Sequence, residues 1–167
     1  LDKDLQFDVC QRCHLQGTSI LAENTSFKDF KPGMKLNDFI DVYLPKYKDD
    51  NSFIMASHVE RLKQSKCFKS SDMTCLDCHN PHKSVQSLSS NYFDKKCMDC
   101  HNVCNDEENI SDCAGCHMPS SSSSDIPHVT ITDHKISIPK ILEKDNYNTD
   151  REFLGLFAIN NDNPTNL

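Results

Sequence analysis

The sequence predicts short α-helices and long irregular loops, with little β structure, wrapped around a core that side chains alone do not supply. Only 37% of the 167 residues are hydrophobic and Trp is absent, so one domain of ordinary size lacks much of the expected apolar interior. No apolar run approaches the roughly eighteen residues that a membrane span needs. Ten cysteines are many for this length, which indicates disulfides, structural zinc or a covalently attached cofactor.

Four pentapeptides with the pattern CxxCH decide among these explanations. They are CQRCH at 10–14, CLDCH at 75–79, CMDCH at 97–101 and CAGCH at 113–117. Shuffling a chain of this composition would give roughly 0.03 of them, so the repeat is not a by-product of many cysteines. The two-residue gap of CxxCH fits one helical turn, so the two thiols can bond to the two vinyl groups of one haem while the adjacent imidazole binds the iron. The sequence therefore predicts four covalent c-type haems, which supply the missing core.

Each motif assigns the same roles to its residues. The cysteines expected to carry the haems are Cys10, Cys13, Cys75, Cys78, Cys97, Cys100, Cys113 and Cys116. The histidines expected to bind iron from the tethered side are His14, His79, His101 and His117. Zinc is the main alternative, but a zinc module has no reason to place His directly after the second Cys four times. A thioredoxin-like redox pair is disfavoured because no βαβ pattern surrounds any motif.

The remaining histidines match the remaining need for ligands. Eight histidines are present, four of them outside the motifs, and four haems with one protein ligand each need four more to become six-coordinate. This match predicts bis-histidine ligation and low reduction potentials. The expected distal ligands are His58, His82, His128 and His134. Methionine ligation would raise the potentials, and we expect the five methionines to be packing residues instead.

The first of these candidates falls in a helical pattern. His58 recurs with Ile54 and Leu62 on one face of a helix expected over 52–65. A histidine on such a face is commonly a core residue, but beside four irons that need ligands we favour a distal role.

The other three candidates are constrained by their neighbours in the sequence. His128 and His134 lie in DIPHVTITDHKI, whose β-branched alternation predicts an extended segment. Six residues of strand separate them by roughly 20 Å, so they should serve two different haems. His82 follows His79 by three residues and cannot reach the far face of the haem held by its own motif. It should bind a different haem, and these two haems should lie close together.

Two cysteines remain outside the motifs, Cys67 and Cys104. Haem c proteins mature after export, where disulfides persist, so we expect a periplasmic or extracellular protein in which these two cysteines pair. Two buried free thiols are the alternative. The chain begins with Leu and its first motif starts at residue 10, so we expect a processed or excised form.

Motif spacing predicts a single tetrahaem domain over 1–167 in three parts. Residues 1–50 hold the first haem, residues 51–135 hold a cluster of three, and residues 136–167 form a C-terminal tail. Because the last three motifs follow one another closely, their haems should form one cluster. The first haem should pack onto it.

Three local expectations complete the outline. After the first motif, a loop broken by Pro and Gly should lead into a short amphipathic segment that ends at Pro45. The serines at 120–124 should form a flexible surface loop. The tail contains one apolar patch, 153–159, expected to cover a haem or to meet another subunit.

Several stretches together resemble a known family. CQRCHLQG, FKDFKPGMKLNDFIDV, HVERLKQSKCF, CLDCHNPHK, CAGCHMP and DIPHVTITDHKI are similar to bacterial multihaem c-type cytochromes of the cytochrome c-554-like, doubled-CxxCH class. The resemblance covers residues 8 to about 160 and implies an exported electron carrier. It also implies the distal role of the four non-motif histidines and a disulfide between Cys67 and Cys104. Chains of that class are often longer, so we expect this one to be a trimmed form or a piece of a larger polypeptide.

Charge and ligand count favour electron transfer, with no catalytic residue needed. The net charge of -7, before the haem propionates, argues against nucleic acid and favours basic redox partner proteins or an extracellular electron acceptor. One alternative is a redox enzyme acting on a small nitrogen or sulfur compound, which needs a five-coordinate haem that the histidine count disfavours. The other is a subunit of an extracellular haem filament or larger multihaem assembly, which the apolar patch at 153–159 would permit.

Overall fold

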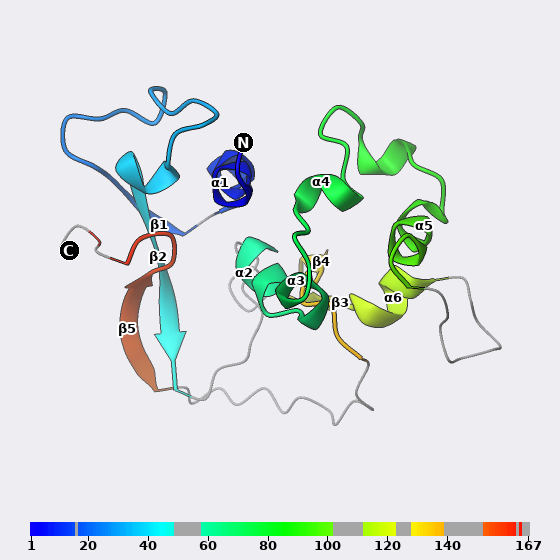
Figure 1. Cartoon of the computed structure of the whole chain (residues 1–167). Coiled ribbons are helices and arrows are strands. Elements are labelled where there is room, and N and C mark those ends of the chain that lie inside the picture. Colours follow the sequence, from blue (N-terminus) through cyan, green and yellow to red (C-terminus); the bar gives the residue numbers. More distant parts are fainter. Residues whose placement is uncertain are drawn as a thin grey trace.

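The first helix lies between a small sheet and a group of short helices (Figure 1). The computed structural model describes residues 1–15, 17–48, 58–101, 112–122, 128–138, 152–162 and 164. Helix α1 (Lys3–His14) contacts the 3-10 helix η1 (Leu36–Asp38) on the side of the sheet and helix α2 (His58–Lys63) on the other. None of the described helices is long and apolar enough to cross a membrane.

The sheet joins the two ends of the chain. Its strands are β1 (Thr18–Leu21), β2 (Ile40–Tyr47) and β5 (Phe153–Ala158), antiparallel in the order β1-β2-β5. The Asn160 side chain extends the connection beyond β5: it accepts a hydrogen bond from the Val42 N–H and donates one to the Ile40 carbonyl, both at 2.8 Å. A strand of the C-terminal tail is therefore built into the segment that carries the first motif.

Pro45 does not end its segment as expected, because β2 continues through it to Tyr47. Strand β1 pairs with β2 only as far as Tyr43, whereas β5 pairs with β2 at Pro45 itself, opposite Leu156. Proline lacks an N–H and is tolerated in a strand where one side makes no ladder. The expectation was wrong because it treated proline as a stop rather than as a residue of a half-paired strand.

The serine run is not simply a loop. Ser120–Ser122 form strand β3, which pairs antiparallel with β4 (Thr130–Thr132), so the expectation was wrong for these three residues. The other two serines of the run lie outside the described residues. A run of one small polar residue has no alternation to indicate a strand, and only the pairing with β4 makes it one.

The other helices are short and carry the motifs. They are α3 (Lys66–Lys69), α4 (Cys75–Cys78), η2 (Val85–Ser87), α5 (Tyr92–Met98) and α6 (Cys113–His117). Helix α2 covers the end of the helix expected over 52–65, and residues 52–57 lie outside the described part of the chain.

Two small hydrophobic clusters hold α1 in place. One lies against the sheet and consists of Leu15, Phe30, Leu36, Ile40 and Val42. The other joins α1 to α2 and consists of Phe7, Val59 and Leu62. Beyond them, every described hydrophobic side chain between 66 and 138 remains partly or fully exposed. The described residues of the region with three of the four motifs therefore contain no fully buried hydrophobic side chain, and those that pack inward, such as Phe68 and Ile136, do so against the cluster between α1 and α2.

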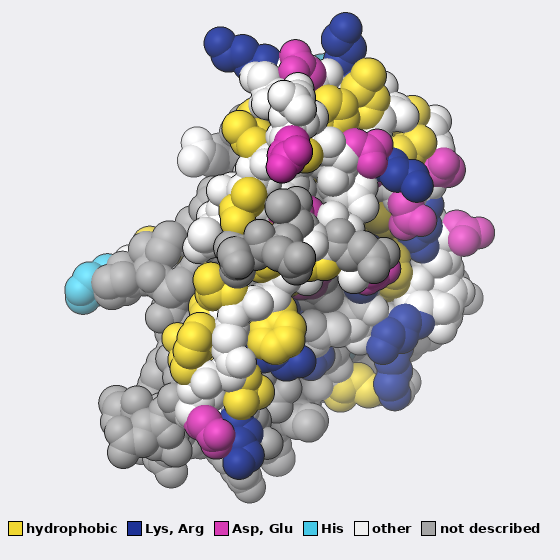
Figure 2. All heavy atoms as spheres, turned by 90° about the vertical axis from the view of Figure 1, so that its left-hand side faces the viewer, with side chains coloured by type: hydrophobic (Ala, Val, Ile, Leu, Met, Phe, Trp, Pro, Cys, Tyr) yellow, Lys and Arg dark blue, Asp and Glu magenta, His cyan; other side chains and the backbone are white. Residues whose placement is uncertain are grey.

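Strand β5 carries apolar side chains on its surface. Phe153, Leu154, Leu156 and Phe157 are 39 to 56% exposed, and Figure 2 shows apolar side chains gathered on this side of the molecule. Their role in covering a haem or meeting another subunit stays a prediction.

Candidate functional site

Each CxxCH motif forms a single helical turn. The first motif is the last turn of α1, α4 and α6 coincide with the second and fourth, and the third begins at the end of α5. In the second and third motifs the His N–H donates to the carbonyl of the first cysteine, His79 to Cys75 at 2.8 Å and His101 to Cys97 at 3.0 Å. Such a turn places residues i and i+3 on one face. The two thiols and the imidazole of one motif can therefore meet one haem.

Caps stabilise the shortest of these turns. At α4 the Thr74 hydroxyl accepts from the Leu76 N–H at 3.3 Å, and the Asp77 carboxylate accepts from the Thr74 N–H at 2.6 Å. At α6 the Asp112 carboxylate accepts from the Gly115 N–H at 2.9 Å. Helices of four or five residues do not persist in isolation, so these bonds, each worth about 1 kcal/mol, help to fix the motif geometry.

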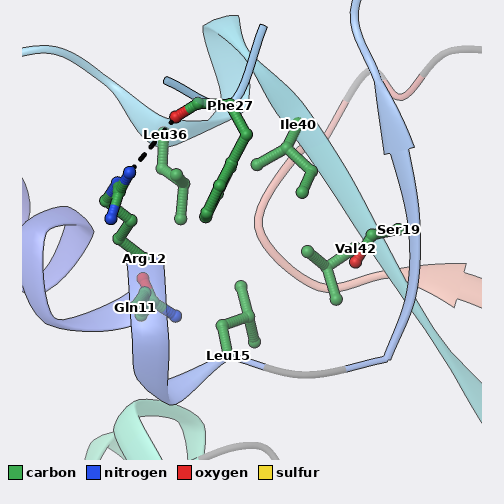
Figure 3. Close-up of a pocket in the computed structure, with 8 residues that line it drawn as sticks. All are labelled: Gln11, Arg12, Leu15, Ser19, Phe27, Leu36, Ile40 and Val42. Atoms are coloured by element: carbon green, nitrogen blue, oxygen red, sulfur yellow. Dashed lines mark hydrogen bonds between the residues drawn. The ribbon is translucent and has the colours of Figure 1, made fainter. Parts of the chain in front are cut away.

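The first motif is anchored by its two middle residues (Figure 3). Gln11 is buried, and Arg12 donates to the Phe27 carbonyl at 3.4 Å while its guanidinium lies 4.5 Å from the Phe27 ring centre. Both residues line a cavity of about 200 Å³ between α1, η1 and the sheet. This anchoring fixes α1 to the sheet, and it leaves the thiols and His14 for contacts with the other helices.

Four histidines from distant parts of the chain form a row. The ring centres of His14 and His58 lie 5.8 Å apart, those of His58 and His134 lie 4.5 Å apart, and those of His134 and His79 lie 6.2 Å apart. Two members belong to the first and second motifs and two are expected distal ligands. The structure thus brings two candidate ligand sets together, and we call these four residues the histidine row.

A polar contact set holds His134 against α2. Arg61 Nε donates to Asp133 Oδ1 at 2.8 Å, and its Nη2 donates to the other oxygen of the same carboxylate. The Ser65 hydroxyl, whose residue is 1% exposed, accepts from the Ile136 N–H at 2.8 Å and donates to the His134 carbonyl at 3.3 Å. These bonds fix the backbone on both sides of the His134 side chain.

The hydrogen bonds of two histidines leave Nε2 available for a metal. His134 Nδ1 lies 3.1 Å from the Thr132 carbonyl oxygen, and His117 Nδ1 lies 3.0 Å from the Ser137 carbonyl oxygen. A carbonyl only accepts, so Nδ1 carries the proton and, in the neutral ring, Nε2 keeps its lone pair. Histidine ligands of metals are commonly oriented in this way.

His58 contains a buried nitrogen without a partner. Its Nδ1 has no hydrogen bond, and it is the only such buried side-chain atom in the part of the chain that the structure describes. Leaving a buried polar atom unsatisfied costs about 1 to 3 kcal/mol, which is unusual unless the group has another role. The ring adjoins two other histidines, which suits a ligand better than a simple core residue.

The environment favours the neutral form of three histidines in the row, His58, His79 and His134. Burial, together with the neighbouring imidazoles of His134, His14 and His79, lowers the pKa of His58 to about 4. Burial also lowers the pKa values of His79 and His134. Neutral imidazole is the form that binds iron, so the ligand form is present at neutral pH.

The pKa of Asp133, next to His134, is shifted by opposing effects. Burial raises it, but the hydrogen bonds from Arg61 and from the Lys135 N–H outweigh burial, and the pKa lies below its ordinary value. Asp133 is therefore an ionised partner of Arg61 at neutral pH.

The first cysteines of the motifs meet in pairs. The thiols of Cys10 and Cys75 form a hydrogen bond, which lowers the pKa of Cys10 to about 7 and, together with burial, raises the pKa of Cys75. Burial raises the pKa of Cys97 to about 11, and its thiol is hydrogen-bonded to that of Cys113. The first motif therefore adjoins the second, and the third adjoins the fourth.

A buried carboxylate supports the second of these pairs. Asp94, on α5, is 6% exposed and accepts a hydrogen bond from the Cys113 N–H at 2.8 Å. This bond ties the start of the fourth motif to the helix that leads into the third.

The remaining expected site residues lie at the surface or outside the described ranges. His82 and His101 are exposed, and the His82 N–H donates to the Asn80 side chain at 3.0 Å. His128 is exposed with a φ of 64°, so β4 begins only after it. Their ligand roles stay predictions. Cys67 is partly buried, and Cys104 lies outside the described residues, so their pairing also stays a prediction.

The motif residues are of the kinds that hold a covalent haem, two thiols and one imidazole in each motif. Within the described ranges, no three or more His, Cys, Asp or Glu side chains converge in a way that would hold a metal ion. Haem iron takes four ligands from the porphyrin and needs only two from the protein. The helical motif turns, the lowered pKa values of His58, His79 and His134, and the exposed apolar residues between 66 and 138 all suit such a cofactor.

No protein-family model, curated protein or solved structure matches the chain. The candidate site therefore stands on its own residues and contacts.

Sequence reasoning missed the residues that position the row. Arg61, Ser65 and Asp133 are buried or nearly so and hold the backbone around His134. The one available signal was the acidic residue directly before His134, since carboxylates commonly accompany histidine ligands. Neither Arg61 nor Ser65 belongs to a pattern that would indicate this role.

Proposed function

We propose that this chain is a tetrahaem c-type cytochrome that transfers electrons, exported to the periplasm or the extracellular space. The histidine row carries the proposal. It brings the motif histidines His14 and His79 beside His58 and His134, which come from separate segments, and the pKa values of His58, His79 and His134 are lowered. Four CxxCH turns and three buried or half-buried histidines with lowered pKa values are difficult to explain without a haem.

In this proposal every motif contributes two thioether bonds and one iron ligand. The distal ligands are the four non-motif histidines, so that each iron is six-coordinate. The class that the sequence resembles, the doubled-CxxCH multihaem cytochromes, supports the same assignment. Bound haem supplies one-electron exchange between its ferric and ferrous states.

The chain's own residues keep that exchange free of side chemistry. A histidine on both sides of an iron leaves no position for a substrate, so no catalytic residue is needed. Histidine rather than methionine ligands keep the potentials low. The negative surface favours a basic redox protein or an extracellular acceptor as partner, and nucleic acid is not expected to bind.

Intact mass of the protein, purified from a host that attaches haem c, tests the cofactor. Four haems add about 2.5 kDa to the polypeptide, and replacing Cys97 and Cys100 by Ala should remove one quarter of that increment. Cys67→Ala is the matched control, because this cysteine lies outside the motifs and its loss should leave the haem content unchanged. A mass within a few daltons of the bare polypeptide would contradict the proposal and would instead fit thiols that are free or joined as disulfides.

Electron paramagnetic resonance separates a carrier from an enzyme. A carrier with four bis-histidine haems gives only low-spin ferric signals, whereas an enzyme with an open iron gives a high-spin signal that changes when nitrite is added. A high-spin haem in the unmodified protein would favour the redox enzyme.

A further inference from the structure

The order of rings in the histidine row limits which histidines share an iron. Two imidazoles that bind one metal from opposite sides, with metal–nitrogen bonds of about 2 Å, have ring centres roughly 6 Å apart. His14 and His58 lie at 5.8 Å, and His79 and His134 lie at 6.2 Å. Both pairs consist of one motif histidine and one non-motif histidine, as bis-histidine ligation of a c-type haem requires.

The two inner members of the row belong to different irons. His58 and His134 are the closest pair, with ring centres 4.5 Å apart. Each covalent haem already has its own motif histidine on one side, so two non-motif histidines cannot occupy the same iron. Their contact therefore means that two distal ligands, serving two neighbouring haems, pack against each other.

We propose that His58 is the ligand opposite His14 on the first haem and that His134 is the ligand opposite His79 on the second. This assignment rests on the proposed function. The hydrogen bond between Cys10 and Cys75 supports it, because the attachment points of these two haems adjoin as their ligands do.

Contacts with α2 position both non-motif histidines of the pairing. Phe7 precedes His14 by two helical turns on α1 and packs with Val59, the residue after His58, so α1 and α2 are held together beside the first pair. His134 is held against this same helix, by the bond of its carbonyl to Ser65 and by the ion pair of the preceding Asp133 with Arg61.

The assignment leaves His82 and His128 for the third and fourth haems. His82 cannot reach the far face of the haem that His79 binds. In this assignment His134 binds that face, so His82 remains available for another haem. The N–H bond to Asn80 turns the chain directly after the second motif, and the exposed imidazole of His82 remains available to a neighbouring haem.

Counting high-spin ferric haems by electron paramagnetic resonance tests the pairing in the haem-loaded chain. His58→Ala should give one high-spin haem per chain, and so should His134→Ala. In a background without the first haem, made by replacing Cys10 and Cys13 with Ala, His58→Ala should add none and His134→Ala should still add one. In the background without the second haem, made by Cys75→Ala with Cys78→Ala, His134→Ala should add no high-spin haem and His58→Ala should add one. His82→Ala is the control and should add one high-spin haem in both backgrounds.

A second set of variants covers the case in which a chain lacking one haem does not fold. Combining His14→Ala with His58→Ala should alter one haem per chain if the two residues share an iron, and two haems if they do not. The pair His79→Ala with His134→Ala is read in the same way. Two altered haems in either double variant, or the reverse pattern in the haem-deleted backgrounds, would overturn the pairing.

Haem content separates this inference from the proposed function. A chain without the mass of four haems would overturn the proposed function, and the pairing with it. A chain with four low-spin haems whose variants follow another pattern would overturn the pairing alone.

Discussion

The Ser65 hydroxyl is the contact whose removal is most informative. Its residue is 1% exposed, and it bridges the end of α2 to the Ile136 N–H and the His134 carbonyl. In Ser65→Ala both bonds are lost, but the Ile136 N–H keeps a second bond to the His134 carbonyl at 3.0 Å. Because that bond offsets part of the loss, we expect a decrease in the free energy of unfolding of about 1 to 2 kcal/mol.

Thermal unfolding of the haem-loaded protein, followed by circular dichroism, measures this change. For a chain of this size the expected loss lowers Tm by about 2 to 8 °C. Ser87→Ala is the matched control, since its hydroxyl is exposed and donates only to the nearby Ser84 carbonyl, at 2.7 Å. Equal Tm values for the two variants would refute the view that Ser65 holds the segment around His134.

Three further predictions concern contacts near the motifs and the sheet. In Asp133→Asn the free energy of unfolding should depend less steeply on pH at acid pH. The pKa of Asp133 is lower in the folded chain than in the unfolded chain, so its carboxylate stabilises the fold above about pH 4. This contribution is lost as the pH falls toward the lowered pKa. Urea titrations at several pH values check this, and an unchanged slope would count against the Arg61 contact. Asp94→Ala should lower the free energy of unfolding, measured by urea titration, by about 1 to 3 kcal/mol because the Cys113 N–H loses its acceptor. Asp94→Asn keeps an acceptor oxygen and should lower it less. Equal decreases in the two variants would contradict the hydrogen bond. Gly17→Ala should lower Tm by several degrees, since a Cβ there would lie 2.6 Å from the Tyr43 carbonyl oxygen and force the β1–β2 pairing to shift; no change would show that the strands adapt freely.

The motif turns are the part of the candidate site that the sequence predicts best. Attachment at two thiols and coordination by the next residue fix a local geometry, so the spacing within five residues is sufficient to predict a helical turn. The structure forms such a turn in all four motifs. The haems that the motifs predict remain a proposal.

The histidine row could not be predicted from the sequence because it depends on tertiary contacts. His58 and His134 are 76 positions apart in the chain, and the bonds that bring them together involve a serine and an arginine of ordinary surface type. The expectations for two strand segments were wrong for a similar reason. Pro45 and the serines at 120–122 show no strand pattern in the sequence, and they lie in strands because β5 and β4 pair with them.

The two halves of the molecule differ in what stabilises them. The sheet, η1 and the end of α1 share a cluster of buried side chains that includes Leu36 and Val42, which are 1 and 2% exposed. The region of α4, α5 and α6 instead depends on caps, one buried carboxylate and contacts between thiols. Helices of four to seven residues have a costly nucleus and little intrinsic stability, so local bonds of about 1 kcal/mol each cannot offset the entropy of ordering this region. Covalent haem, attached at the cysteines of this region, would supply further apolar contact, and in this proposal its attachment and the folding of the second half are one process.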